Sequence, residues 1–180
     1  MIRKNCQKGY SLVEMLIYIA ILVVLLVAIV NTLIVITASH RTLKVSANIQ
    51  AAAVSAMDRI TREVREAKSI ASGDFGVDYA QPPNAAKKIV LNTTDSTGAA
   101  RTVQFHLDGT NSDVLDINDN GTDGPLTTSN VKVFTLIFSQ ITVAGVSTAI
   151  KIEMGLQASQ GTVLEQQKFY STVVLRGSYQ

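Results

Sequence analysis

One carboxylate stands inside an otherwise apolar segment near the start of the chain. Glu14 is the single charged side chain among the 25 residues from Leu12 to Ile36. At about 1.5 Å per residue, a helix of this length exceeds the ~20 residues that cross ~30 Å of hydrocarbon. A carboxylate at the centre of a bilayer costs roughly 2.5–3.5 kcal/mol, and less near an interface. Glu14 therefore needs a partner that neutralises its charge, and the nature of that partner is a clue to what this segment does.

The residues before this segment are basic. Arg3, Lys4 and Lys8 precede Gly9 without any acidic residue, and this bias predicts that the N-terminal end stays cytoplasmic while the rest crosses outward. A cleavable secretory signal would place small residues just upstream of a cut that follows the apolar region. The sequence at residues 31–33 has no such site, so a plain signal anchor is the alternative that composition leaves open.

The stretch Lys8-Gly9-Tyr10-Ser11-Leu12-Val13-Glu14 resembles the class III leader of type IV pilins and type II secretion pseudopilins. The resemblance implies that a prepilin peptidase cuts between Gly9 and Tyr10 and methylates the new amine of Tyr10. It also implies that Glu14 is the assembly residue. The family most often has phenylalanine after the glycine, and the tyrosine of this chain is a near-isostere, so we expect processing to occur.

Processing would place a new amino group near Glu14. In a filament, the amine of an incoming subunit can pair with the Glu14 carboxylate of its neighbour in apolar surroundings. Leaving either charge unpaired there would cost several kcal/mol, so the pair favours one register of docking. We therefore expect Glu14 to be needed for incorporation rather than for processing.

Removal of the leader changes the charge and the thiol content of the chain. The 180 residues carry 16 basic and 14 acidic side chains. Three basic residues lie in residues 1–9, so 13 remain against 14 acids, a net charge of −1. The basic full-length chain is therefore no argument for nucleic-acid binding, and no nucleic-acid partner is predicted. The single cysteine, Cys6, lies in the leader, so the mature chain cannot form an internal disulfide.

A long helix is predicted after the leader. No glycine or proline occurs from Ser11 to Ala71, and the first half is apolar on all sides, which predicts residues 10–36 as the transmembrane or filament-core half. Residues 37–72 are predicted as an amphipathic half that ends at Ser72-Gly73. Its apolar stripe has steps of three and four residues and consists of Val54, Met57, Ile60, Val64, Ala67 and Ile70.

Charged residues occupy the rest of this amphipathic half. Arg59–Glu63 and Arg62–Glu66 have the i,i+4 spacing of helical ion pairs. We interpret these charges as a solvated face, and contact with neighbouring subunits is the alternative.

The remaining residues, 73–180, predict an exported β-sheet domain. Alternating apolar and polar positions recur without intervening helices, at 88–91, 102–107, 114–117, 131–139 (extending towards 143), 149–156 and 169–175. Consecutive strands of this kind favour an antiparallel sheet. Ile150, Ile152, Met154 and Leu156 alternate with Lys151 and Glu153, which places the four apolar residues on one face. The predicted fold is α+β, with the long helix packed on the sheet, and the pilin-like family has this architecture.

Within that family the chain most resembles the J-type minor pseudopilins of type II secretion and the W-type minor pilins. The residues that carry this weaker resemblance are Met57–Ala67, Leu126–Phe138 and Phe169–Arg176. It implies a low-copy subunit near the filament tip that helps to initiate assembly. The implied partners are other pilin or pseudopilin subunits, the prepilin peptidase, an inner-membrane assembly platform and the lipid bilayer.

A D-x-N-x-N-G pattern marks one candidate metal site. Asp116, Asn118 and Asn120 alternate as oxygen ligands would in a calcium loop, and Asp123 could add charge. The acid expected at the twelfth position is replaced by Thr127. Asn-Gly and Asp-Gly pairs also mark ordinary turns, so an ordinary loop and a calcium site both stay open, and no other cofactor is predicted.

No catalytic constellation is visible in the exported part. His40 and His106 lack metal-type spacing, and we expect a surface position for the first and a strand position for the second. Nucleophile-elbow, phosphate-loop and dinucleotide-binding motifs are absent from the sequence, so no enzyme activity is predicted. Two hypotheses follow: a pilin-like subunit stored in the inner membrane and assembled into a filament, or a single-pass membrane-anchored binding module that never polymerises.

Overall fold

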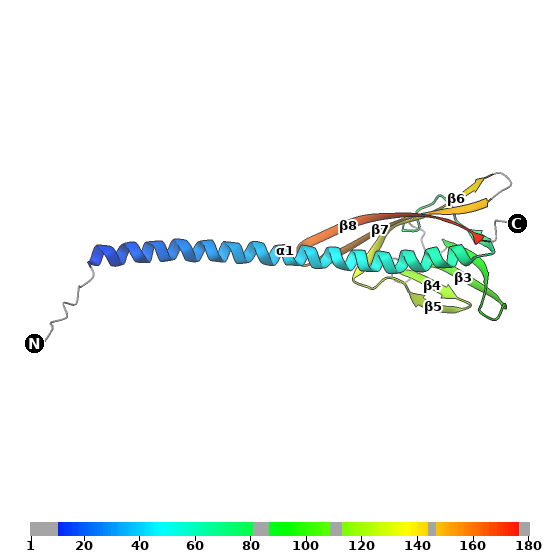
Figure 1. Ribbon diagram of the computed structural model, residues 1–180, viewed down its shortest axis with the longest axis horizontal. Helices are drawn as coiled ribbons and strands as arrows, with labels where there is room; N and C mark the ends of the chain where they lie inside the picture. The colour runs from blue at the N-terminus through cyan, green and yellow to red at the C-terminus, as the bar shows by residue number, and fades with distance from the viewer. Residues whose placement is uncertain (1–10, 81–86, 109–112, 144–146, 177–180) are drawn as a thin grey trace, which may run out of the picture. The chain divides into compact units, whose positions relative to one another are not determined.

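A computed structural model describes residues 11–80, 87–108, 113–143 and 147–176 of the chain (Figure 1). It contains one long helix and antiparallel strands, which confirms the predicted α+β fold. The elements in chain order are α1 (Leu12–Glu66), β1 (Ser69–Gly73), β2 (Lys88–Thr94), β3 (Ala100–Leu107), β4 (Leu115–Asp119), β5 (Thr122–Pro125), β6 (Val131–Val143), β7 (Ser147–Gln160) and β8 (Val163–Val174).

The chain divides into two compact units, Met1–Arg41 and Thr42–Gln180. Among the described residues, the first unit consists of the N-terminal part of α1. The second unit contains the C-terminal part of α1 and all of the strands. The predicted cut site, Gly9 and Tyr10, lies outside the described residues.

The helix ends six residues earlier than residue 72, so the predicted stop at Ser72-Gly73 is wrong. The N–H of Ala67 still donates to the carbonyl of Glu63 at 2.9 Å, but the N–H of Lys68 donates to the carbonyl of Asn92 in β2 at 2.8 Å. Residues 69–73 then pair with β2 as the edge strand β1. Pairing with a neighbouring strand thus overrides a helical pattern that contained no breaker before Gly73.

The strands form two sheets rather than the single sheet that was predicted. The first has the order β1-β2-β3-β4-β5 and the second the order β6-β7-β8. All of the paired strands are antiparallel. The two strands that sequence patterning missed, β1 and β5, are short edge strands of the first sheet, where period-two alternation is weakest.

Asp78 joins the second sheet to the segment that follows β1. Its Oδ1 accepts hydrogen bonds from the N–H of Leu136 in β6 at 2.8 Å and from the N–H of Ala80 at 3.0 Å. The N–H groups of Gly76 and Tyr79 donate to the carbonyls of Phe138 and Leu136 at 2.8 and 2.7 Å. The outer edge of β6 is therefore paired over this stretch by the segment around Asp78, which forms an isolated antiparallel bridge with Ile137.

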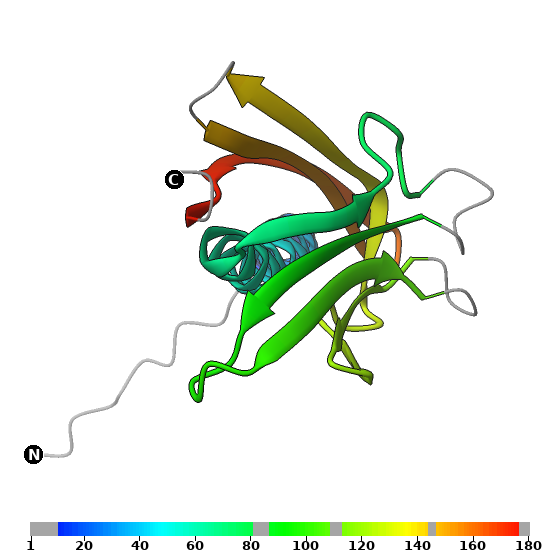
Figure 2. The ribbon, with the colours of Figure 1, turned by 90° about the vertical axis from the view of Figure 1, so that its right-hand side faces the viewer.

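The core lies between the C-terminal part of α1 and the inner faces of both sheets. Figure 2 shows this part of the helix nearly end-on, between β8 and the strands of the first sheet. The predicted inward residues of β7 are all fully buried, as are their counterparts on neighbouring elements: Ile150, Ile152, Met154 and Leu156 with Ile49, Ile60, Leu91, Phe105, Leu115, Leu136 and Phe138. Each large apolar side chain contributes roughly 1.5–3 kcal/mol on burial, so this core holds the domain together without a disulfide.

Candidate assembly helix

The carboxylate of Glu14 lies in the first turn of α1, where the N–H groups of the helix end favour negative charge. The side chain is half-buried. Tyr18 lies one turn later on the same face, and its hydroxyl donates a hydrogen bond to Glu14 Oε1 at 3.1 Å. Sequence reasoning did not identify this partner, although the i,i+4 spacing of the two residues is the signal that could have found it.

The helix around Glu14 exposes a continuous apolar surface. Large apolar side chains from Leu12 to Ile36 are between 45% and 81% exposed. The helix is long and apolar enough to cross a membrane, and none of its most apolar stretch is buried in the protein. Exposed apolar surface on this scale indicates that lipid or other protein chains cover it.

Thr32 lies within this segment and Thr37 directly after it, and the hydroxyl group of each donates a hydrogen bond to the helix backbone. The hydroxyl of Thr32 donates to the carbonyl of Ala28 at 2.8 Å, and that of Thr37 donates to the carbonyl of Leu33 at the same distance. Each hydroxyl is thus satisfied within the helix itself, as a spanning segment requires.

The part of α1 from Thr42 onward packs against the sheets through a stripe that differs from the predicted one. Its buried members are Val45, Ile49, Ala53, Ala56, Ile60, Glu63 and Val64. Ile60, Val64 and Ala67 were predicted correctly and Met57 is partly buried, but Val54 is 69% exposed and Ile70 belongs to β1. The sequence prediction did not include Ala53 and Ala56, which are 1% and 0% exposed.

A buried carboxylate lies in this stripe and is paired with two arginines. Glu63 is 2% exposed. Its Oε1 lies 2.9 Å from a terminal nitrogen of Arg59, as the i,i+4 spacing predicted, and both oxygens also accept hydrogen bonds from Arg101 in β3 at 3.2 and 3.3 Å. The interpretation of these charges as a solvated face is therefore wrong for Glu63.

Arg101 connects this carboxylate to a second one. Its Nε donates to Asp119 Oδ1 in β4 at 2.6 Å, and its second terminal nitrogen donates to Asp119 Oδ2. These hydrogen bonds hold the pKa of the Asp119 carboxyl below its usual range, and the charges of Arg101 and Arg59 act in the same direction. The predicted Arg62–Glu66 pair is replaced by an exposed Arg62–Asp58 pair at 3.2 Å.

The candidate calcium segment folds as a β-hairpin. Asp116 and Asn118 lie in β4, Asp123 lies in β5 opposite Asn118, and Asn120-Gly121 forms the turn with φ of 51° and 94°. Positive φ at both central residues is typical of a two-residue type I′ turn. The segment thus has hairpin geometry in place of a twelve-residue EF-hand loop.

Side chains of the hairpin bond to one another and to the backbone. Asn118 donates to Asp123 Oδ1 at 2.8 Å and accepts from the N–H of Gly121 at 2.9 Å. Thr127, at the predicted twelfth position, is buried and accepts from the N–H of Leu115 at 3.0 Å. Within the described residues, no three His, Cys, Asp or Glu side chains are grouped to hold a metal. Calcium binding at Asp116, Asn118, Asn120 and Asp123 stays a prediction.

The two histidines lie in the expected positions, one on the surface and one in a strand. His40 is exposed on α1. His106 lies in β3 opposite Asp116, and its Nε2 is 4.0 Å from Asp123 Oδ1. Burial raises the pKa of the Asp116 carboxyl above its usual range, the negative charges of Asp108 and Asp123 add to this rise, and His106 opposes it.

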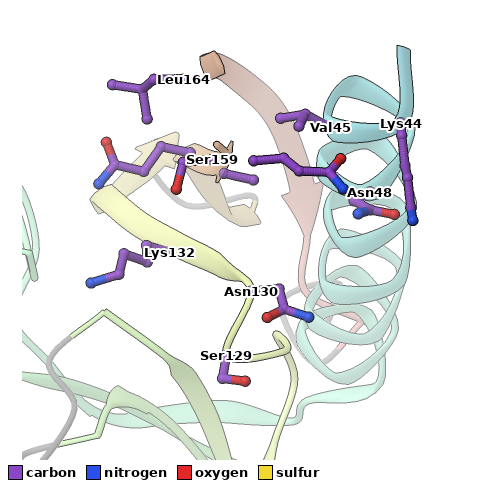
Figure 3. A pocket seen from close by; sticks show the side chains of 11 residues that line it. Lys44, Val45, Asn48, Ser129, Asn130, Lys132, Ser159 and Leu164 are labelled. Atoms are coloured by element: carbon purple, nitrogen blue, oxygen red, sulfur yellow. The ribbon is translucent and has the colours of Figure 1, made fainter. Parts of the chain in front are cut away.

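A polar groove of about 430 Å³ lies beside residues 44–48 of α1 (Figure 3). Lys44 and Lys132 lie on opposite sides of it, and Lys132 pairs with Asp113 at 2.7 Å. The other lining residues that Figure 3 labels are Val45, Asn48, Ser129, Asn130, Ser159 and Leu164. The described residues that line the groove are two lysines, one leucine, two small apolar or aliphatic side chains and several hydroxyl and amide side chains, so the groove offers mainly polar contacts.

The N-terminal segment of the chain matches a known family model. A family model described as the prokaryotic N-terminal methylation motif matches residues 4–30. The match supports a type IV pilin-like protein that is processed as a prepilin, and it implies processing by a prepilin peptidase and assembly with other pilin subunits. The exposed apolar helix and this motif together fit membrane anchoring and a filament. Neither curated proteins nor solved structures give a match to the chain.

Proposed function

We propose that this chain is a minor pilin or pseudopilin, a structural subunit of a type IV pilus or type II secretion filament. The prepilin peptidase cuts it after Gly9 and methylates Tyr10. The mature subunit is held in the inner membrane by residues 10–36, with its C-terminal domain exported. The match of residues 4–30 to the methylation motif carries this proposal, because that range includes the cut, Glu14 and most of the apolar segment.

The assembly step uses the same helix in two surroundings. Before assembly, lipid covers the exposed apolar side chains from Leu12 to Ile36. In the filament, helices of neighbouring subunits replace the lipid, and Glu14 pairs with the N-terminal amine of a neighbour. Because a buried charge without a partner is strongly unfavourable, this pair selects one docking register. The role is structural, and no catalytic step is assigned to the exported domain.

A place near the filament tip follows from the resemblance to J-type and W-type minor subunits. The segments that carry it include residues 57–67, which contain the buried Glu63, and residues 126–138, which lead into β6 and contain its first part. A low-copy subunit of this kind contacts other minor subunits and the inner-membrane assembly platform. A major pilin would instead be the bulk building block of the filament.

Intact-mass measurement of the membrane form tests the proposal. In cells that contain a prepilin peptidase, we expect the wild-type mass to fall by residues 1–9 and to rise by one methyl group. A Gly9→Val variant, which places a β-branched side chain at the cut, should keep its leader. An unprocessed wild-type chain that folds and stays in the membrane would contradict the proposal and support the anchored binding module.

A further inference from the structure

The hydrogen bond between Tyr18 and Glu14 joins two side chains on one face of the apolar helix. The phenol oxygen lies 3.1 Å from Glu14 Oε1. Tyr18 is 53% exposed, and Met15, Ile21 and Leu22, which lie three or four positions away on the same helix face, are 53%, 52% and 61% exposed. The donor and the carboxylate therefore share a surface that is otherwise apolar.

Tyrosine suits this position for a physical reason. A carboxylate away from water is costly unless hydrogen-bond donors satisfy it, and hydrogen bonds to an ionised acceptor are roughly twice as strong as neutral ones. The ring of Tyr18 is compatible with lipid, while its hydroxyl supplies the donor. A lysine or arginine one turn away would neutralise Glu14 permanently and would compete with an incoming amine.

The hydrogen bond from Tyr18 leaves acceptor capacity on Glu14. An ionised carboxylate has about four lone-pair positions on two oxygens, and the Tyr18 hydroxyl uses one of them, on Oε1. A primary or N-methylated amine can therefore bind the same carboxylate without displacing the hydroxyl. The hydroxyl also restricts the side-chain rotamers of Glu14, which lowers the entropy lost when the amine docks.

We propose that Tyr18 is the positioning residue for Glu14: its hydroxyl holds the carboxylate in the membrane and presents it to the N-terminal amine of a second subunit. This inference rests on the proposed function. It assigns to Tyr18 a role that acts through Glu14 and leaves processing at Gly9 unaffected.

Substitutions at position 18 that separate the donor from the ring test this role in the full chain, within cells that assemble the filament. Tyr18→Phe removes the hydroxyl, O-methyltyrosine keeps the oxygen but cannot donate, and 4-aminophenylalanine restores a donor on the same ring. We expect normal processing in all three. The fraction recovered in filaments should fall about tenfold for the first two, as for loss of a hydrogen bond to a charged group, and should recover with 4-aminophenylalanine. Tyr170→Phe, at a 59% exposed position in β8, is the matched control and should assemble normally.

Two results of the assembly experiment would overturn the inference. One is wild-type incorporation of Tyr18→Phe, and the other is a 4-aminophenylalanine chain that is processed yet as defective as Tyr18→Phe. Failure of the proposed function looks different, because the wild-type chain itself would then be unprocessed or missing from filaments.

Raman spectra of the unassembled membrane form give a readout that does not need filaments. We expect Glu14→Ala to change the tyrosine doublet that reports hydrogen bonding, and an unchanged doublet would also overturn the inference.

Discussion

Glu63 on α1 and Arg101 on β3 form a two-point contact in which both carboxylate oxygens accept hydrogen bonds from the guanidinium, at 3.2 and 3.3 Å. Thirty-eight positions separate them in the chain. The contact ties the helix to the first sheet at one axial position, because a shift of one helical turn would leave a buried carboxylate without its partner.

Removal of the Glu63 carboxylate should destabilise the exported domain. We expect Glu63→Ala to lower the free energy of unfolding by about 3 kcal/mol. This is near the lower end of the roughly 3–5 kcal/mol that is typical of breaking a buried ion pair. The cost is low because Arg101 and Arg59 still have Asp119 as a partner. Urea unfolding of the detergent-solubilised chain measures this, with circular dichroism as the signal. Asp58→Ala removes the exposed pair with Arg62 and should cost less than about 1 kcal/mol. Equal costs for the two variants would contradict the buried role of Glu63.

Protonation of Asp119 at acid pH should account for part of the stability that the domain loses there. Arg101 holds the folded-state pKa of this carboxyl below its unfolded value of about 3.9. The stabilisation is therefore present above that unfolded value and is lost as the pH falls through the folded-state pKa. We expect Asp119→Asn to be less stable than wild type at neutral pH and to lose less stability between about pH 5 and pH 2. Unfolding curves measured across this range should converge for the two chains at the acid end, and a constant difference would contradict the assignment.

Gly155 in β7 should resist substitution because of Phe134. A Cβ built at Gly155 would lie 2.7 Å from the Phe134 ring, which sits at the bulge of β6 between Val133 and Thr135. We expect Gly155→Ala to lower the melting temperature, with a cost of about 1–3 kcal/mol from overpacking. Gly124→Ala in β5 is the matched control, since no atom lies within 4 Å of its Cβ position. If ring contact is the cause, the cost of Gly155→Ala should shrink in a Phe134→Ala background.

Loss of the Glu14 carboxylate should separate processing from assembly. We expect Glu14→Ala to lose its leader and gain its methyl group as wild type does, but to be absent from filaments, because the docking amine would have no carboxylate to pair with. Comparison of intact masses with the amount of subunit in sheared filaments measures both steps. Glu66→Ala, at an exposed position at the end of the same helix, is the control and should assemble. Normal recovery of Glu14→Ala in filaments would remove the assembly role.

Millimolar calcium tests the calcium prediction at the β4–β5 hairpin. A calcium site at Asp116, Asn118, Asn120 and Asp123 would have to draw on side-chain oxygens that already accept hydrogen bonds within the hairpin, at Asp123 Oδ1 and Asn118 Oδ1. A melting temperature that is the same in millimolar calcium and in a chelator would remove the calcium prediction. A rise with calcium that disappears in Asp116→Asn would instead establish a calcium site at this hairpin.

The sequence by itself determined the features that depend on neighbours along the chain. The exposed apolar segment with its single carboxylate, most of the long helix, six of the eight strands and the inward face of β7 all follow from local composition and from periods of 3.6 and 2. The position of Glu14 relative to the predicted cut is likewise a matter of spacing alone.

Features that depend on contacts between residues far apart in the sequence were decided only by the tertiary structure. The end of α1 at Glu66 follows from strand pairing of Ser69–Gly73 with β2, and the division into two sheets follows from which strand edges meet. The burial of Glu63 required Arg101 and Asp119, which lie on strands far along the chain. Helical periodicity states which residues share a face, but only packing decides which face is covered and which charge on it is paired.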